Sequence, residues 1–174
     1  MNPIVHAELS WLGGSRLDDR RDRLLVTLAG VLPDLDGLTL LAGEEAYGRW
    51  HHLVTHGALS SLLICGVLAA FGKRRAVVFG LGLAMFHLHL LCDLAGSGPG
   101  WPIFYLWPFS RAELMWSGQW DLASWQNSLV GLGATLAVLW CAVPLGRTAV
   151  ELFSLKTDAK VVAALRARFK RDAP

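Results

Sequence analysis

The chain has 174 residues, a formal net charge of +2, 53% hydrophobic residues and only 17% charged residues. This length suits one domain, and the charged fraction lies below the roughly 25% of ordinary soluble domains, so the composition favours a membrane protein. The balanced charge does not favour a nucleic-acid partner. The three cysteines form no CxxC pair, and the opening residues MNPIVHAELS have no basic signal-peptide start, so we expect insertion through internal segments.

Four segments predict helices, over residues 24–42, 58–71, 76–94 and 128–146. A full crossing of the bilayer takes about 20 residues, so the last segment is adequate, the middle two are slightly short, and the apolar stretch before Pro33 crosses only half. The short GKRR turn at 72–75 makes the middle two an antiparallel hairpin. The predicted fold is an all-α, multi-helix integral membrane bundle. The alternative is a soluble helical protein with solvated runs of charge.

Basic residues gather in three groups, and these hold fourteen of the sixteen Lys and Arg residues, within 16–23, 73–75 and 147–171. If the four predicted helices cross the membrane in alternating directions, all three groups lie on the same side of the membrane. The positive-inside rule predicts that this side is cytoplasmic. We therefore expect a multi-pass protein whose C-terminus is cytoplasmic.

Two further segments have a distinctive composition. The connection 95–127 holds five Trp residues and Tyr105, a density typical of chain at the level of the lipid headgroups. From Glu151 onward, apolar and basic residues alternate, which suits an amphipathic helix on an anionic membrane surface. The predicted organisation is one membrane-embedded helical domain over 1–150 and a basic amphipathic cytoplasmic tail over 151–174.

All six histidines lie near carboxylates or helix ends. Together with three aspartates they form four clusters: His6; Asp34 and Asp36; His51, His52 and His56; His87, His89 and Asp93. Ionisable groups at membrane depth are costly, so they are expected to be paired or functional. Imidazole and carboxylate suit zinc or another divalent transition ion, and a set this large suits two ions bridged by water. We therefore expect a His/Asp metal site near one membrane face.

Helical spacing separates the three residues of the last cluster. His89 and Asp93 are four residues apart and share a helix face, whereas His87 points elsewhere. The sequence thus predicts His89 and Asp93 as a ligand pair, and His87 as a packing or supporting residue whose part in the site stays open.

The other clusters leave alternatives. Asp34 and Asp36 follow Pro33, where extended chain could aim both carboxylates at metal, although a polar turn is the alternative. His52 and His56 are four residues apart, which favours them as a pair on a helix. If a helix starts only near His56, however, His51 reaches equally well.

Five motifs in order carry a family resemblance: HAELSWLGG, LPDLDG, HHLVTHG, HLLCDLAGSGPGWPIFYLWPFS and GQWDLASWQN. Over about residues 3–128 the chain resembles the bacterial family of LexA-regulated, membrane-bound predicted metal-dependent hydrolases, which is distantly similar to zinc-dependent phospholipase C. The resemblance implies an all-helical protein of the bacterial inner membrane with a His/Asp metal site and presumed phosphoester hydrolysis.

Residue by residue, the resemblance implies a set of metal ligands: His6, Asp34, Asp36, His51, His56, His89 and Asp93. The family often reads HRGxTHS in the third motif, so here His52 replaces an Arg and Gly57 replaces a Ser. This assignment selects His51, whereas helical spacing favours His52, and the choice stays open.

The predicted function is metal-dependent hydrolysis of a small-molecule or lipid phosphoester by metal-activated water. Zinc, with manganese as the alternative, is expected as one or two ions, and Asp36 and His52 are the candidate catalytic residues. One rival is a non-enzymatic metal-binding or cation-conducting membrane protein. Another is a helix bundle with satisfied core histidines and no metal. The oligomeric state is left open.

Overall fold

Helices make up all the regular structure of the computed structural model, which describes residues 1–169. In chain order the elements are α1 (Pro3–Gly14), α2 (Arg20–Ala29), the 3₁₀ helix η1 (Leu32–Ala42), α3 (Glu44–Trp50), α4 (Ala58–Ala70), α5 (Arg75–Gly96), α6 (Trp125–Leu145), the 3₁₀ helix η2 (Ala149–Leu152) and α7 (Leu155–Phe169). The described residues contain one isolated β-bridge, between Ile103 and Leu114, and no strand. The all-α prediction is confirmed. Residues 170–174 of the predicted tail lie outside the described part.

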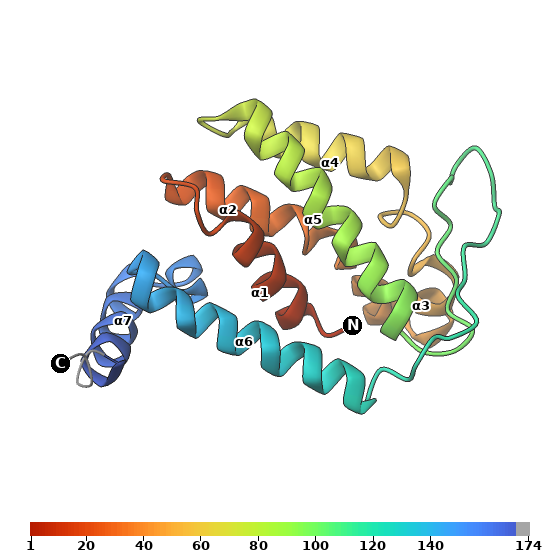
Figure 1. Ribbon diagram of the computed structural model, residues 1–174. Coiled ribbons are helices and arrows are strands. Elements are labelled where there is room, and N and C mark those ends of the chain that lie inside the picture. Colours follow the sequence, from red (N-terminus) through yellow and green to blue (C-terminus); the bar gives the residue numbers. More distant parts are fainter. Residues whose placement is uncertain (170–174) are drawn as a thin grey trace.

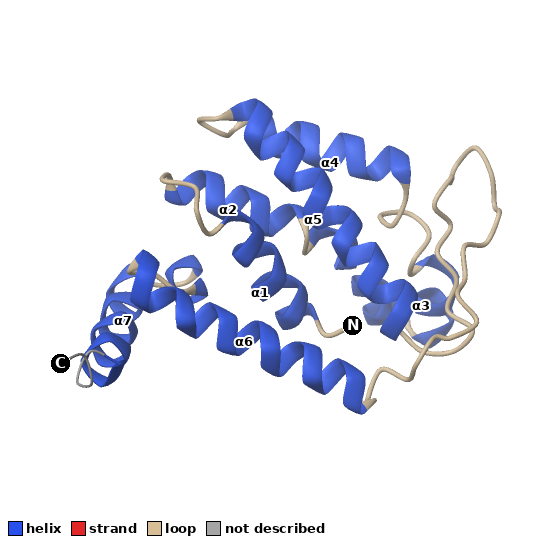
Figure 2. Ribbon diagram, viewed as in Figure 1, coloured by secondary structure: helices blue, strands red, loops and turns tan. Residues whose placement is uncertain are grey.

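The helices form a bundle in which α2 and α5 are central (Figure 1). α1 packs against α2 and α6, α4 packs against α5, and α7 turns away from the end of α6. The long irregular connection from α5 to α6 lies at the same end of the molecule as α3 (Figure 2). The start of α2, the α4–α5 turn and α7, which carry most of the basic residues, lie at the opposite end (Figure 1).

Small residues allow the central helices to approach closely. A Cβ atom at Gly30 would lie 1.8 Å from Ser10 Oγ, so α1 crosses the end of α2 at a position that only glycine fits. At Gly82 a Cβ would meet Ala29 at 3.3 Å. Close packing of this kind holds helices together where lipid tails remove the hydrophobic drive for association. Phe86 and Cys65 fill the adjoining core and are fully buried.

The segment predicted as one helix over 24–42 is two helices, α2 and η1, bent by 53°. The expectation of extended chain after Pro33 is wrong, because residues 32–42 continue as a 3₁₀ helix. Pro33 stands in the first turn of η1, where its missing N–H has no helical partner to lose. The chain therefore changes direction in a turn at Gly30 and Val31, and helical geometry resumes at Leu32.

Two helices are long and apolar enough to cross a membrane, α5 and α6, and the bent pair α2–η1 is a third candidate. α4 is apolar but has only 13 residues, short of the roughly 20 needed for a full crossing. Only 17% of the apolar window of α6 is buried. Exposed leucines along α6 therefore face outward, as expected of a membrane-facing helix.

A buried ion pair fastens the end of the chain to the bundle. Glu151 in η2 accepts hydrogen bonds from Arg23 at 2.5 Å and from Trp11 at 2.9 Å. Burial would raise the pKa of Glu151, but the bonds from Arg23 and Trp11 lower it below its ordinary value. Arg166 of α7 bonds the Ala142 carbonyl of α6 at 3.0 Å. Packing is thus continuous across the expected boundary between residues 150 and 151.

Replacing Glu151 by Gln should destabilise the fold by about 3–5 kcal/mol, because Arg23 would keep a buried charge without its partner. Thermal unfolding of the full chain in detergent, followed by the helical circular dichroism signal, measures the change. Because the folded-state pKa of Glu151 is lowered, the pair stabilises the fold above the ordinary pKa of glutamate. The gap between wild type and variant should shrink as pH falls through the folded-state pKa.

Glu45→Gln is the matched control, since Glu45 pairs with Arg49 on an exposed surface where both side chains are largely solvent-accessible. Such pairs contribute about 0–1 kcal/mol. Equal destabilisation by the two variants would contradict the role assigned to Glu151.

Candidate metal centre

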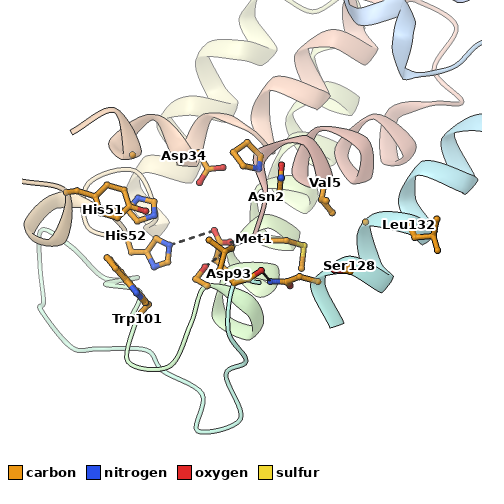
Figure 3. Close-up of a pocket in the computed structure, with 17 residues that line it drawn as sticks. Met1, Asn2, Val5, Asp34, His51, His52, Asp93, Trp101, Ser128 and Leu132 are labelled. Atoms are coloured by element: carbon orange, nitrogen blue, oxygen red, sulfur yellow. Dashed lines mark hydrogen bonds and ion pairs between the residues drawn. The ribbon is translucent and has the colours of Figure 1, made fainter. Parts of the chain in front are cut away.

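Four parts of the chain bring their histidines and aspartates to one end of the bundle, and Figure 3 shows Asp34, His51, His52 and Asp93 of this group. α1 contributes His6 and the second half of α5 contributes His89 and Asp93. The remaining residues come from η1 and from the turns that precede α4: Asp34, Asp36, His51, His52 and His56. Residues far apart in sequence thus form one polar group in an otherwise apolar protein.

A core of four residues has the arrangement of a metal site. Asp34, His56, His89 and Asp93 each offer a ligand atom, and these atoms lie within 4.8 Å of one another. His89 Nε2 lies 2.8 Å from Asp93 Oδ2 and 3.3 Å from His56 Nε2. His56, His89 and Asp93 are buried. This four-residue group could hold a metal ion, and its nitrogen and oxygen donors suit zinc.

The outer nitrogens of both ring ligands are held by acceptors. His89 Nδ1 donates to the carbonyl of Gly30 at 2.9 Å. His56 Nδ1 donates to Asp36 Oδ2 at 3.0 Å. Each ring therefore turns its Nε2 toward the centre of the group, which is the orientation that supporting carbonyl and carboxylate groups give to metal-binding histidines.

Asp36 supports two rings at once. Its second oxygen accepts a bond from His51 Nδ1 at 2.7 Å. Both carboxylate oxygens are therefore engaged by histidines, and Asp36 stands behind His56 instead of within the four-residue group.

Asp93 lies at the middle of the cluster. His6 Nε2 lies 3.2 Å from its Oδ1 atom, and His52 Nε2 lies 3.9 Å from its Oδ2 atom (Figure 3). The ring of His6 also stacks on that of His89, with centroids 3.8 Å apart. The Met1 amino group contacts the same carboxylate.

Within residues 1–169, four buried side-chain atoms make no hydrogen bond of good geometry, and all belong to this cluster: His6 Nδ1, Asp34 Oδ2, His52 Nδ1 and Asp93 Oδ2, the last of which nevertheless lies 2.8 Å from His89 Nε2. A buried polar atom without a partner costs free energy. Two of the four are carboxylate oxygens, for which a cation is the natural partner. The residues present therefore fit a divalent metal ion.

The histidines of the loop differ in basicity. Burial, followed by the nearby charge of His56, lowers the pKa of His52 to about 3. Burial would also lower the pKa of His56, but its bonds to Asp36 and Asp93 raise it to about 9. The pKa values of these two rings thus shift in opposite directions from the ordinary value for histidine.

A cavity of about 850 Å³ opens beside the cluster, within the roughly 300–1,000 Å³ of typical ligand sites. Asp34, His51, His52 and Asp93 line one part of it. The cluster is thus accessible to a ligand from one side.

A family model described as the YdjM inner membrane protein family matches residues 4–164. The chain belongs to this family. The match includes every histidine and aspartate of the cluster and most of α7. No curated protein and no solved structure matched the chain. The YdjM name and the apolar helices confirm the predicted inner-membrane location and the membrane-bound part of the family resemblance.

In this YdjM-family protein the structure changes the argument about the histidine loop. α4 begins at Ala58, after His56, so the helical spacing that favoured His52 over His51 does not apply. Both residues reach the cavity: His51 bonds Asp36, and His52 faces Asp93. His52 also has a φ of 63°, a left-handed conformation that is uncommon outside glycine.

His87 lies apart from the cluster. Its Nε2 lies 2.9 Å from the Tyr105 hydroxyl, and its Nδ1 donates to the Leu83 carbonyl of the preceding turn at 2.8 Å. The neighbouring helix residue His89 points to the opposite side, as the spacing on α5 requires.

Sequence reasoning missed two aromatic residues of the cavity, Tyr47 and Trp101. Tyr47 stacks on His51 with centroids 4.4 Å apart, and Trp101 meets the edges of His51 and His52 at 5.8 and 5.9 Å. In the sequence, Trp101 was recognisable only as one of several aromatic residues expected at the membrane interface. Its neighbours Gly98 and Gly100, both at positive φ, mark the tight turns that fold it back onto the loop.

Replacing His89 or Asp93 by Ala should lower the zinc retained by the purified full chain several-fold, because each removes a donor of the four-residue group. Asp36→Asn should weaken affinity by about 10–100-fold through loss of support for His56. Elemental analysis after zinc loading and dialysis in detergent measures the effect, and circular dichroism checks that the helices remain.

His87→Phe is the control, and it should retain wild-type metal. Loss of metal in this variant together with full retention in His89→Ala would contradict the assignment.

Proposed function

We propose that this protein is a membrane-bound, metal-dependent hydrolase of phosphoesters. The observation that carries the proposal is the buried four-residue His/Asp group, in which Asp34 Oδ2 has no hydrogen-bond partner among the described residues, beside an open cavity of about 850 Å³. A closed, saturated group would instead favour a protein that only stores or passes a cation.

The ligands proposed for zinc, with manganese as the alternative, are Asp34, His56, His89 and Asp93. His6 approaches Asp93 from outside this group, which leaves a donor for a second ion. When bound, such ions polarise a phosphoryl oxygen and make water more acidic.

The chain's own residues supply the rest of the chemistry. His52 lines the cavity and its Nε2 atom faces Asp93 Oδ2 at 3.9 Å, so it is the proposed proton acceptor from the attacking water. Asp36 acts as a positioning residue that fixes the rings of His51 and His56. Tyr47 and Trp101 close one wall of the cavity and hold the loop in place.

The proposed orientation puts the metal centre on the extracytoplasmic side. The segments that carry most basic residues lie at the end of the bundle opposite to α3 and the centre (Figure 1). Cytoplasmic segments of membrane proteins are enriched in Lys and Arg. The proposed partners are the bilayer and a phosphoester substrate.

Purified full chain loaded with zinc or manganese should hydrolyse bis(p-nitrophenyl) phosphate, and a chelator should abolish the activity. His52→Gln should lower turnover by about 100-fold or more, as expected for loss of a general base, while metal content stays at the wild-type level. His87→Phe should leave both unchanged. If the wild type retains metal but hydrolyses no member of a broad phosphoester panel, the hydrolase proposal is wrong and a non-enzymatic metal-binding protein is the better explanation.

A fluorescent protein fused after Pro174 should fold and fluoresce in cells, because we expect this end in the cytoplasm. Alkaline phosphatase fused at the same point should be inactive, while the same enzyme inserted after Arg111, at the opposite end, should be active. The reverse pattern would invert the topology.

A further inference from the structure

The cavity beside the metal centre has a second, less polar arm. It runs past Asp93 to the start of α1 and the first half of α6, where apolar Val5, Leu122, Gly131 and Leu132 line it together with polar Asn127 and Ser128. Val5, Ser128 and Leu132 lie on the far side of Asp93 from His51 and His52 (Figure 3). One continuous space therefore joins a histidine- and aspartate-rich end to an apolar end.

The apolar arm reaches the outer surface of α6. Leu132 lines the cavity and is nevertheless 56% exposed, and Ser128 is exposed as well. α6 packs against α1 and α7, and its other exposed leucines lie on the surface of a helix that is long and apolar enough to cross a membrane. The arm is therefore open toward the lipid, which a site for a water-soluble substrate does not need.

Gly131 lets α1 and α6 approach each other closely beside this arm. A Cβ atom at this position would lie 3.2 Å from Val5 Cγ2 across the α1–α6 contact. Any side chain larger than hydrogen would thus begin to fill the space between the two helices.

We propose that this arm, lined by Val5, Ser128, Gly131 and Leu132 and here named the chain groove, holds an acyl chain of a membrane-lipid phosphoester. The inference rests on the proposed function and narrows its substrate class. The phosphate of the lipid lies at the His/Asp end and its chain leaves along α6. In the reaction a P–O ester bond breaks, the hydroxyl of water joins phosphorus, and the remaining proton of that water ends on the departing alcohol.

The groove selects its ligand by shape. Because the bilayer is as apolar as the groove, an acyl chain gains little hydrophobic free energy by entering it. Its value is orientation: a chain held along α6 fixes where the phosphate lies relative to the His/Asp group. A bulky side chain in the groove should therefore displace a lipid and leave a small phosphodiester unaffected.

Ser128→Trp is the test variant, and Leu129→Trp is its control. The Ser128 hydroxyl bonds only its own helix, at the Ser124 carbonyl, 3.3 Å away. Leu129 is 59% exposed but does not line the cavity. Ser128→Trp should lower hydrolysis of dioleoyl phosphatidylglycerol in mixed micelles by about tenfold or more, with hydrolysis of bis(p-nitrophenyl) phosphate and metal content unchanged. Leu129→Trp should change none of the three.

A binding measurement separates this inference from the proposed hydrolase activity. The zinc-loaded full chain is incubated with a non-hydrolysable dioleoyl lipid phosphonate, washed in detergent, and the retained lipid is counted by mass spectrometry. Ser128→Trp should retain about fivefold less lipid than Leu129→Trp. If the wild type retains the lipid but hydrolyses no phosphoester, the proposed hydrolase activity is wrong and the chain groove is still supported.

Two results overturn the groove. One is equal lipid retention by the two tryptophan variants. The other is an equal loss of lipid and bis(p-nitrophenyl) phosphate hydrolysis in Ser128→Trp. Gly131→Leu provides a second block at the α1–α6 contact, and it should repeat the Ser128→Trp pattern.

Discussion

The burial of the Asp93 carboxylate is the constraint on which the rest of the structure depends. It is 1% exposed in an apolar helix, and a buried charge is tolerated only when surrounding groups compensate for the water it loses. The compensating groups come from distant parts of the chain, as the imidazoles of His6, His52, His56 and His89. Satisfying this single carboxylate draws α1 and the histidine loop onto α5.

The sequence predicts those parts of the arrangement in which side-chain directions depend on the periodicity of a single helix. His89 and Asp93 lie on one turn of a long apolar helix, so their shared face follows from helical periodicity alone. The same periodicity turns His87 toward Tyr105. The apolar segments likewise predicted α4, α5 and α6 to within a few residues.

Other parts could not be predicted, because they depend on contacts between elements. η1 is unusually long for a 3₁₀ helix. It places Asp36 beside His51 and His56, and no local sequence pattern links Asp36 to these two partners. The left-handed backbone of His52 depends on its loop lying against Trp101. Division of the aspartates into a ligand and a support is a property of the assembled site.

The carbonyl of Gly30 gives the metal centre a second role. The last carbonyls of any α-helix lack partners along the chain, and inside a bilayer an unpaired carbonyl is especially costly. At the end of α2 the His89 ring supplies the missing donor. His89 of the candidate metal centre therefore also caps the C-terminus of α2, so the His/Asp cluster and the end of this helix share one side chain.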